Sequence, residues 1–60
     1  MTELPRPVEV LHKGKWYPGW LEATYRDSDG RWHCFVRYRI APGLQYLQWR
    51  DRDEVRPVEE

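Results

Sequence analysis

The stretch GKWYPGW, Gly14 to Trp20, places two tryptophans and a tyrosine around a Pro-Gly pair. Proline donates no hydrogen bond to a strand ladder and glycine permits sharp bending, so this pair suits a strand that passes from one sheet to another. We therefore expect Trp16 to Arg26 to form one long strand that bends at Pro18-Gly19. The bend predicts a small barrel.

Further strands are expected on both sides of this long one, because Val, Tyr, Trp and Thr are frequent and no segment has helical periodicity. The expected strands are PVEVLH (7–12), the long strand (16–26), RWHCFVRYR (31–39), LQYLQWR (44–50) and VRPV (55–58), with DRDE (51–54) as a single helical or 3₁₀ turn. The sequence thus predicts an all-β fold, a single SH3-like five-stranded antiparallel barrel with a one-turn 3₁₀ helix before the last strand. It would span residues 7–58, between loose tails at 1–6 and 59–60.

Strand alternation assigns the side chains to two faces. In the long strand, the expected core side is Tyr17, Gly19, Leu21, Ala23 and Tyr25, while Trp16 and Trp20 lie on the other side. In the third strand, the expected core side is Trp32, Cys34, Val36, Tyr38 and Ile40, and the opposite side is Arg31, His33, Phe35, Arg37 and Arg39. In the fourth strand, Leu47 and Trp49 face one way and Tyr46 and Gln48 the other. Phe35 is thereby placed among charged groups.

Size and composition exclude several classes of protein. A chain of 60 residues makes one domain, whose small core depends on a few large side chains. The single cysteine, Cys34, allows no intrachain disulfide, and it points away from the adjacent His33 in a strand, so no metal ion or other cofactor is expected. There is no apolar run of membrane-spanning length and no signal-peptide pattern, so we expect a cytoplasmic protein without membrane contacts.

Four segments of the chain resemble the Tudor/Agenet branch of the SH3-like barrels. They are VEVLHKGKW (8–16), WYPGWLEA (16–23), CFVRY (34–38) and YLQWRDRDEVRP (46–57). Tudor-type readers hold a methylated lysine or arginine in a cage of aromatic rings, whose faces attract cations. The resemblance implies a cage made by Trp16, Tyr17, Tyr38 and Tyr46. Where the family has an acidic turn after the third-strand aromatic, this chain carries Arg39.

The aromatic and arginine side chains favour binding over catalysis. Trp16, Trp20 and Phe35 are either buried by the twist of a barrel or exposed as an apolar patch. In the second case, Trp16, Trp20 and Phe35, with Arg37 and Arg39 at the edge, would bind a protein or peptide, or a second copy in a homodimer. Protein or peptide binding is the function that the sequence favours.

Two other functions remain open. Single-stranded DNA or RNA binding would use the arginine and aromatic face of the third strand, made by Arg31, His33, Phe35, Arg37 and Arg39. Ten basic residues balance ten acidic ones, however, so the chain as a whole does not attract phosphates. An enzyme is not expected, because the acids cluster in turns and tails. The rival from the enzyme class is an oligomeric reductase resembling the plasmid-encoded dihydrofolate reductases, which are SH3-like barrels.

Overall fold

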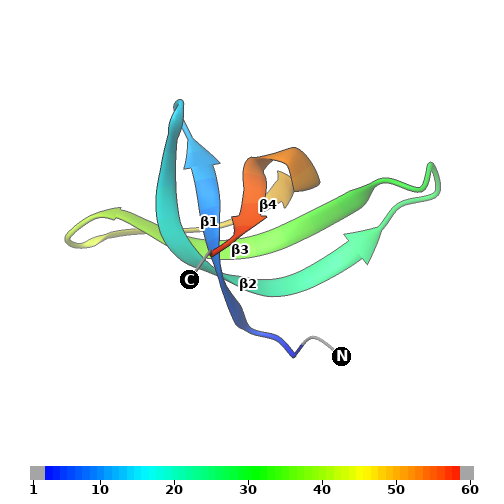
Figure 1. The fold of residues 1–60 in the computed structure, drawn as a ribbon, viewed down its shortest axis with the longest axis horizontal. Coiled ribbons are helices and arrows are strands. Elements are labelled where there is room, and N and C mark those ends of the chain that lie inside the picture. Colours follow the sequence, from blue (N-terminus) through cyan, green and yellow to red (C-terminus); the bar gives the residue numbers. More distant parts are fainter. Residues whose placement is uncertain (1–2, 59–60) are drawn as a thin grey trace.

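The computed structural model describes residues 3–58 and shows an all-β chain with one short 3₁₀ turn (Figure 1). The elements are β1 (Arg6–His12), β2 (Lys15–Arg26), β3 (Trp32–Ala41), β4 (Leu44–Asp51), η1 (Arg52–Glu54) and β5 (Val55–Pro57). The prediction of an all-β fold with five strands is confirmed. Arg6, which was expected in the N-terminal tail, begins β1 opposite Leu21. Tail residues 1–2 and 59–60 lie outside the described residues.

All five strands join one sheet in the order β4-β3-β2-β1-β5, and every neighbouring pair is antiparallel. β2 bends strongly in its middle, so that its first half runs beside β1 and its second half runs beside β3 (Figure 1). Within residues 3–58 no ladder joins β4 to β5, and the sheet is not closed there. Closure into a barrel therefore stays a prediction.

Gly19 permits the close approach of β2 to β3. A Cβ atom at Gly19 would lie 2.6 Å from the carbonyl oxygen of Arg37 and 2.7 Å from the Cβ of Tyr38. Carbon atoms in ordinary contact lie about 3.5–4.0 Å apart, so no side chain fits at this position. The Pro-Gly pair predicted to bend the strand thus includes a residue at which β2 and β3 leave no room for a side chain.

The core between the two halves of the bent sheet is small. Its buried side chains are Val8, Val10, Cys34, Val36 and Tyr38. The partly buried side chains packed against them are Tyr17, Leu21, Ile40, Tyr46 and Val55. The prediction that the third strand faces the core is confirmed for its buried residues. It is wrong for Trp32, which is 42% exposed because it lies at the start of β3, beyond the end of the core.

A bulge in β2 overturns part of the predicted face assignment. The pairing of β2 with β3 shifts register between Leu21 and Ala23, which leaves Glu22 as the extra residue. One extra residue reverses the side to which the following side chains point. Ala23 therefore lies opposite Phe35, on the side away from the core, and Tyr25 is 53% exposed. The prediction that Ala23 and Tyr25 face the core is wrong.

Candidate functional site

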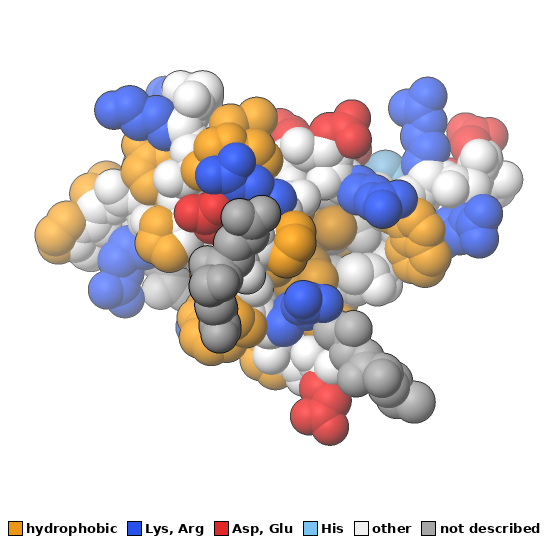
Figure 2. All heavy atoms as spheres, in the orientation of Figure 1, with side chains coloured by type: hydrophobic (Ala, Val, Ile, Leu, Met, Phe, Trp, Pro, Cys, Tyr) orange, Lys and Arg blue, Asp and Glu red, His pale blue; other side chains and the backbone are white. Residues whose placement is uncertain are grey.

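The side of the sheet that faces away from the core carries a contiguous group of apolar side chains. Residues directly opposite on neighbouring strands point to the same side. Pairing across β2, β3 and β4 gives the rows Trp20–Arg37–Leu47, Ala23–Phe35–Trp49 and Tyr25–His33–Asp51. We call the surface made by Trp20, Tyr25, Phe35, Leu47 and Trp49 the outer apolar face. Figure 2 shows that apolar side chains are interspersed with Lys and Arg on the visible side of the molecule.

Most of the outer apolar face is open to solvent. The exposed fractions are 43% for Trp20, 53% for Tyr25, 56% for Leu47 and 53% for Trp49. Phe35 is half-buried because it packs against Trp49, with ring centroids 4.9 Å apart. Tyr25 stacks on His33 at 5.3 Å and meets Trp49 edge-on at 5.8 Å. These ring contacts join Tyr25, Phe35 and Trp49 into one cluster.

Hollows flank the outer apolar face at its two ends. At one end, Trp20, Arg37 and Arg39 border an open groove of about 440 Å³, which Pro18 and Gln45 also line. At the other end is a shallow hollow of about 500 Å³, lined by Tyr25, His33 and Trp49. Of the residues predicted to bind a partner, Trp20, Arg37 and Arg39 therefore meet at one groove, and Phe35 lies on the same side of the sheet.

Trp16 lies apart from this group. It opposes Leu11 on β1, and the guanidinium of Arg56 from β5 lies 4.1 Å from the centre of its ring. Arg56 in turn donates to Glu9 at 2.7 Å. Trp16 is thus half-buried under an arginine on the β1–β5 part of the sheet, and it does not contribute to the outer apolar face.

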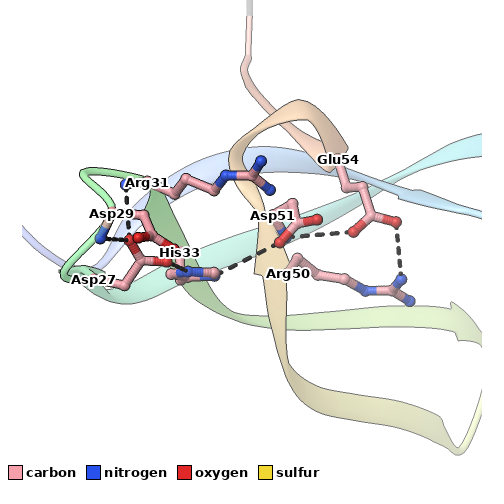
Figure 3. Close-up of polar contacts among 7 residues, drawn as sticks. All are labelled: Asp27, Asp29, Arg31, His33, Arg50, Asp51 and Glu54. Atoms are coloured by element: carbon pink, nitrogen blue, oxygen red, sulfur yellow. Dashed lines mark hydrogen bonds and ion pairs between the residues drawn. The ribbon is translucent and has the colours of Figure 1, made fainter.

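Two of the five residues of the predicted nucleic-acid face already have acidic partners. Arg37 donates from Nε to Glu22 at 2.9 Å. His33 lies between two carboxylates, with Nε2 2.8 Å from Asp27 and Nδ1 3.6 Å from Asp51 (Figure 3). Within residues 3–58, the basic side chains of this face that are left without a carboxylate partner are those of Arg31 and Arg39.

Asp27 organises the turn that joins β2 to β3. Its Oδ1 accepts the backbone N–H groups of Asp29 and Arg31, both at 2.9 Å, and its Oδ2 faces His33 (Figure 3). The hydrogen bond from His33, followed by that from the Arg31 backbone, lowers the pKa of Asp27 below its ordinary value of 3.8. The turn, and with it the orientation of His33, therefore depends on an ionised carboxylate.

Stability should consequently fall in acid through Asp27. Because its folded pKa is the lower one, its contribution is fully present above the ordinary pKa of 3.8 and is lost as the pH falls through the folded pKa. In urea unfolding across this range, Asp27→Asn should be less stable than the parent at neutral pH, and the difference should disappear in acid. Asp29→Asn, whose side chain is exposed at the same turn, is the control. A difference between parent and Asp27→Asn that stays constant with pH would contradict the role of the charge.

The predicted aromatic cage is filled by the chain's own side chains. Tyr17, Tyr38 and Tyr46 surround the ring of His12, with centroid distances of 6.0, 5.6 and 5.3 Å. Arg50 donates from Nη2 to the hydroxyl of Tyr38 at 2.6 Å, and its guanidinium carbon lies 5.6 Å from the centre of that ring. A methylated cation would have to displace both His12 and Arg50.

Sequence reasoning missed several of these residues. The sequence offered a signal for Leu47 and Trp49, since they alternate with Tyr46 and Gln48 and were expected to share one side of their strand. Tyr25 was assigned to the wrong side because the bulge was not predicted.

The cysteine and the two histidines do not form a metal site in the described part of the chain. Cys34 is buried in the core, and desolvation raises the pKa of its thiol above the ordinary 9.0. His33 points to the outer side, as the alternation of β3 predicts. Among residues 3–58 there is no group of three His, Cys, Asp or Glu side chains arranged to hold a metal ion.

Comparison of the chain with protein-family models, with curated proteins and with solved structures gives no match. The resemblance to Tudor and Agenet domains therefore stays a prediction. Across residues 3–58, no helix is long and apolar enough to cross a membrane.

Proposed function

We propose that this chain is a small non-catalytic module that binds another protein through its outer apolar face. The observation that carries the proposal is that Trp20, Tyr25, Leu47 and Trp49 are each about half exposed on one side of one sheet. Single exposed apolar residues are ordinary, but a contiguous group of this size typically marks an interaction site. Trp, Tyr and Arg are also the residues enriched at the centres of protein interfaces.

The fold supports this proposal. The five antiparallel strands and the 3₁₀ turn before the last strand agree with the all-β arrangement from which the sequence predicts an SH3-like barrel. In this arrangement β2, β3 and β4 present one broad surface, with a groove bordered by Arg37 and Arg39 at its end. The arginines supply a polar rim beside the apolar centre.

The contacts favour a protein ligand over the alternatives. Nucleic-acid binding is less well supported, because Glu22 already pairs with Arg37 and Asp27 already forms a hydrogen bond with His33. Amide chemical shifts during titration with a single-stranded oligonucleotide at low salt separate the two ligands. We expect no shifts in β3, whereas large shifts that vanish steeply with added salt would favour nucleic acid.

The proposal requires the exposed tryptophans to be dispensable for folding. Trp20→Ala should keep cooperative unfolding and should cost less than the about 3–5 kcal/mol lost at a fully buried tryptophan, because 43% of Trp20 is already in contact with solvent. Urea denaturation followed by circular dichroism measures this change. Loss of cooperative unfolding would place Trp20 in the core and remove it from the binding surface.

Two leucines of β4 give a matched pair for testing the surface itself. Leu47 is 56% exposed on the outer apolar face, and Leu44 is 50% exposed three residues earlier, on the opposite side of the strand. Leu47→Glu should abolish protein partners captured by the wild-type chain, whereas Leu44→Glu should keep them. Quantitative pull-downs with the wild type, Leu47→Glu and Leu44→Glu as baits measure how much partner protein each of them captures. Partners retained equally by all three baits would refute the proposed surface.

A further inference from the structure

We propose that the protein bound at the outer apolar face is a second copy of this chain, in a two-fold, face-to-face dimer. This inference rests on the proposed function, because it names the partner of the same surface. Three properties of the face support it: its apolar content relative to the core, its exposed area, and the order of charges along it.

The outer apolar face holds larger apolar side chains than the core does. The buried residues are three valines, a cysteine and a tyrosine, whereas the outer apolar face has two tryptophans, a tyrosine, a phenylalanine and a leucine. A domain of about 60 residues buries only about 60% of the surface that its unfolded chain exposes. Oligomerisation is one of the usual ways by which such small domains gain stability. A second copy on this face would give each chain a further apolar interior.

The exposed area is suitable for a specific interface. With about 150–250 Å² for each large side chain, the exposed parts of Trp20, Tyr25, Leu47 and Trp49 sum to roughly 300–500 Å². A standard interface buries about 800 Å² on each partner. The four side chains therefore supply about half of what a stable dimer needs. Pro18, Gln45 and the stems of Arg37 and Arg39 border the same side and provide the rim.

The outer apolar face has a basic residue at one end and an acidic residue at the other, so two copies related by a two-fold rotation can pair opposite charges. The row at one end contains Arg39 opposite Gln45, and the row at the other end contains His33 opposite Asp51. Arg39 is exposed without a carboxylate partner in residues 3–58, and the side chain of Asp51 is 73% exposed. A two-fold axis that lies in the interface and runs across the strands near Phe35 and Trp49 reverses the order of the rows. Arg39 of each copy would then lie at the His33–Asp51 end of the other copy, next to Asp51. The zero net charge adds no overall repulsion between copies.

Sedimentation of the intact chain, followed to high concentration, tests the dimer. We expect the wild type and Leu44→Glu to dimerise with similar affinity, and Leu47→Glu to remain monomeric while keeping its folded amide spectrum. A monomeric wild type would overturn the dimer; the proposed function would still stand if other proteins bind in a Leu47-dependent way. A dimer that survives Leu47→Glu would overturn the dimer on this face and would count against the proposed surface as well.

The arrangement within the dimer can be tested by exchanging charges. Arg39→Glu should weaken dimerisation at least about tenfold, because it places a second acid over each Asp51. Lys15→Glu, which is exposed in the β1–β2 hairpin, should not weaken it. Asp51→Arg should weaken the dimer to a similar extent.

Mixing Arg39→Glu with Asp51→Arg should restore wild-type affinity, since both contacts in the mixed dimer then join opposite charges. If Asp51→Arg does not fold, Arg39→Glu and its Lys15→Glu control suffice to test the contact. Equal affinities for Arg39→Glu and the wild type would overturn the proposed arrangement.

Discussion

Gly19→Ala is expected to abolish cooperative unfolding at room temperature. The added methyl group would lie 2.6 Å from a backbone oxygen and 2.7 Å from the Cβ of Tyr38, so the backbones of β2 and β3 would have to separate. Overpacking usually costs about 1–3 kcal/mol when side chains can adjust. Here a backbone must move, and a core this small rarely supplies more than about 3–5 kcal/mol in total. Circular dichroism during urea titration should show no sigmoidal transition.

Gly43→Ala provides the control for this result. An added methyl group at Gly43 would meet no neighbour within 4 Å, but the φ of +79° at this residue lies in the left-handed region. Alanine there should cost about 1–2 kcal/mol from backbone strain alone, and cooperative unfolding should remain. Equal losses for Gly19→Ala and Gly43→Ala would show that the close approach of β2 and β3 is not what requires glycine.

Tyr38→Phe should lower the free energy of unfolding by about 1.5–3 kcal/mol, because it removes one hydrogen-bond acceptor of the half-buried guanidinium of Arg50. The hydroxyl of Tyr38 accepts from Arg50 at 2.6 Å, lies 2.9 Å from Nδ1 of His12 and donates to Gln48 at 3.3 Å. Nε of Arg50 is buried and already lacks a partner among the described residues. Losing the Tyr38 contact would leave this guanidinium with fewer hydrogen bonds in a desolvated place.

Tyr46→Phe removes a hydroxyl from the same aromatic cluster but breaks no hydrogen bond within residues 3–58. The Tyr46 ring stacks on His12 at 5.3 Å, and its hydroxyl forms no hydrogen bond within residues 3–58. Its free energy of unfolding should stay within about 0.5 kcal/mol of the wild type. Urea midpoints for the two variants provide the comparison. A loss for Tyr38→Phe no larger than that for Tyr46→Phe would mean that Arg50 does not depend on the hydroxyl.

The strands and the turns between them could be predicted because their signals are local. Alternation in β3 correctly placed Cys34, Val36 and Tyr38 in the core, and turn residues located the ends of the strands. The bulge was not predictable in this way. Glu22 has neither glycine nor proline beside it to mark an irregularity, and a bulge is defined by pairing with another strand.

The outer apolar face was partly predictable, because the alternation of side chains along each strand is a local signal. Trp20, Phe35 and Arg37 share one side, as alternation on two paired strands predicts. The separation of Trp16 from them depends on where Arg56 of β5 lies, which is set by the packing of β1 against β5. The filling of the aromatic cluster by His12 and Arg50 likewise brings together residues 38 positions apart in the chain.

The bulge at Glu22 decides which side chains of β2 belong to the outer apolar face. Before the bulge, the odd-numbered residues of β2 point to the core. After it, the odd-numbered residues point to the outer side, so Tyr25 faces outward because β2 contains one extra residue. Glu22 itself pairs with Arg37 on that side. A change of one residue in length, and not a series of substitutions, can thus convert the end of a core strand into exposed surface. Insertion or deletion of one residue at Glu22 is then a single mutational step that would expose or bury Tyr25.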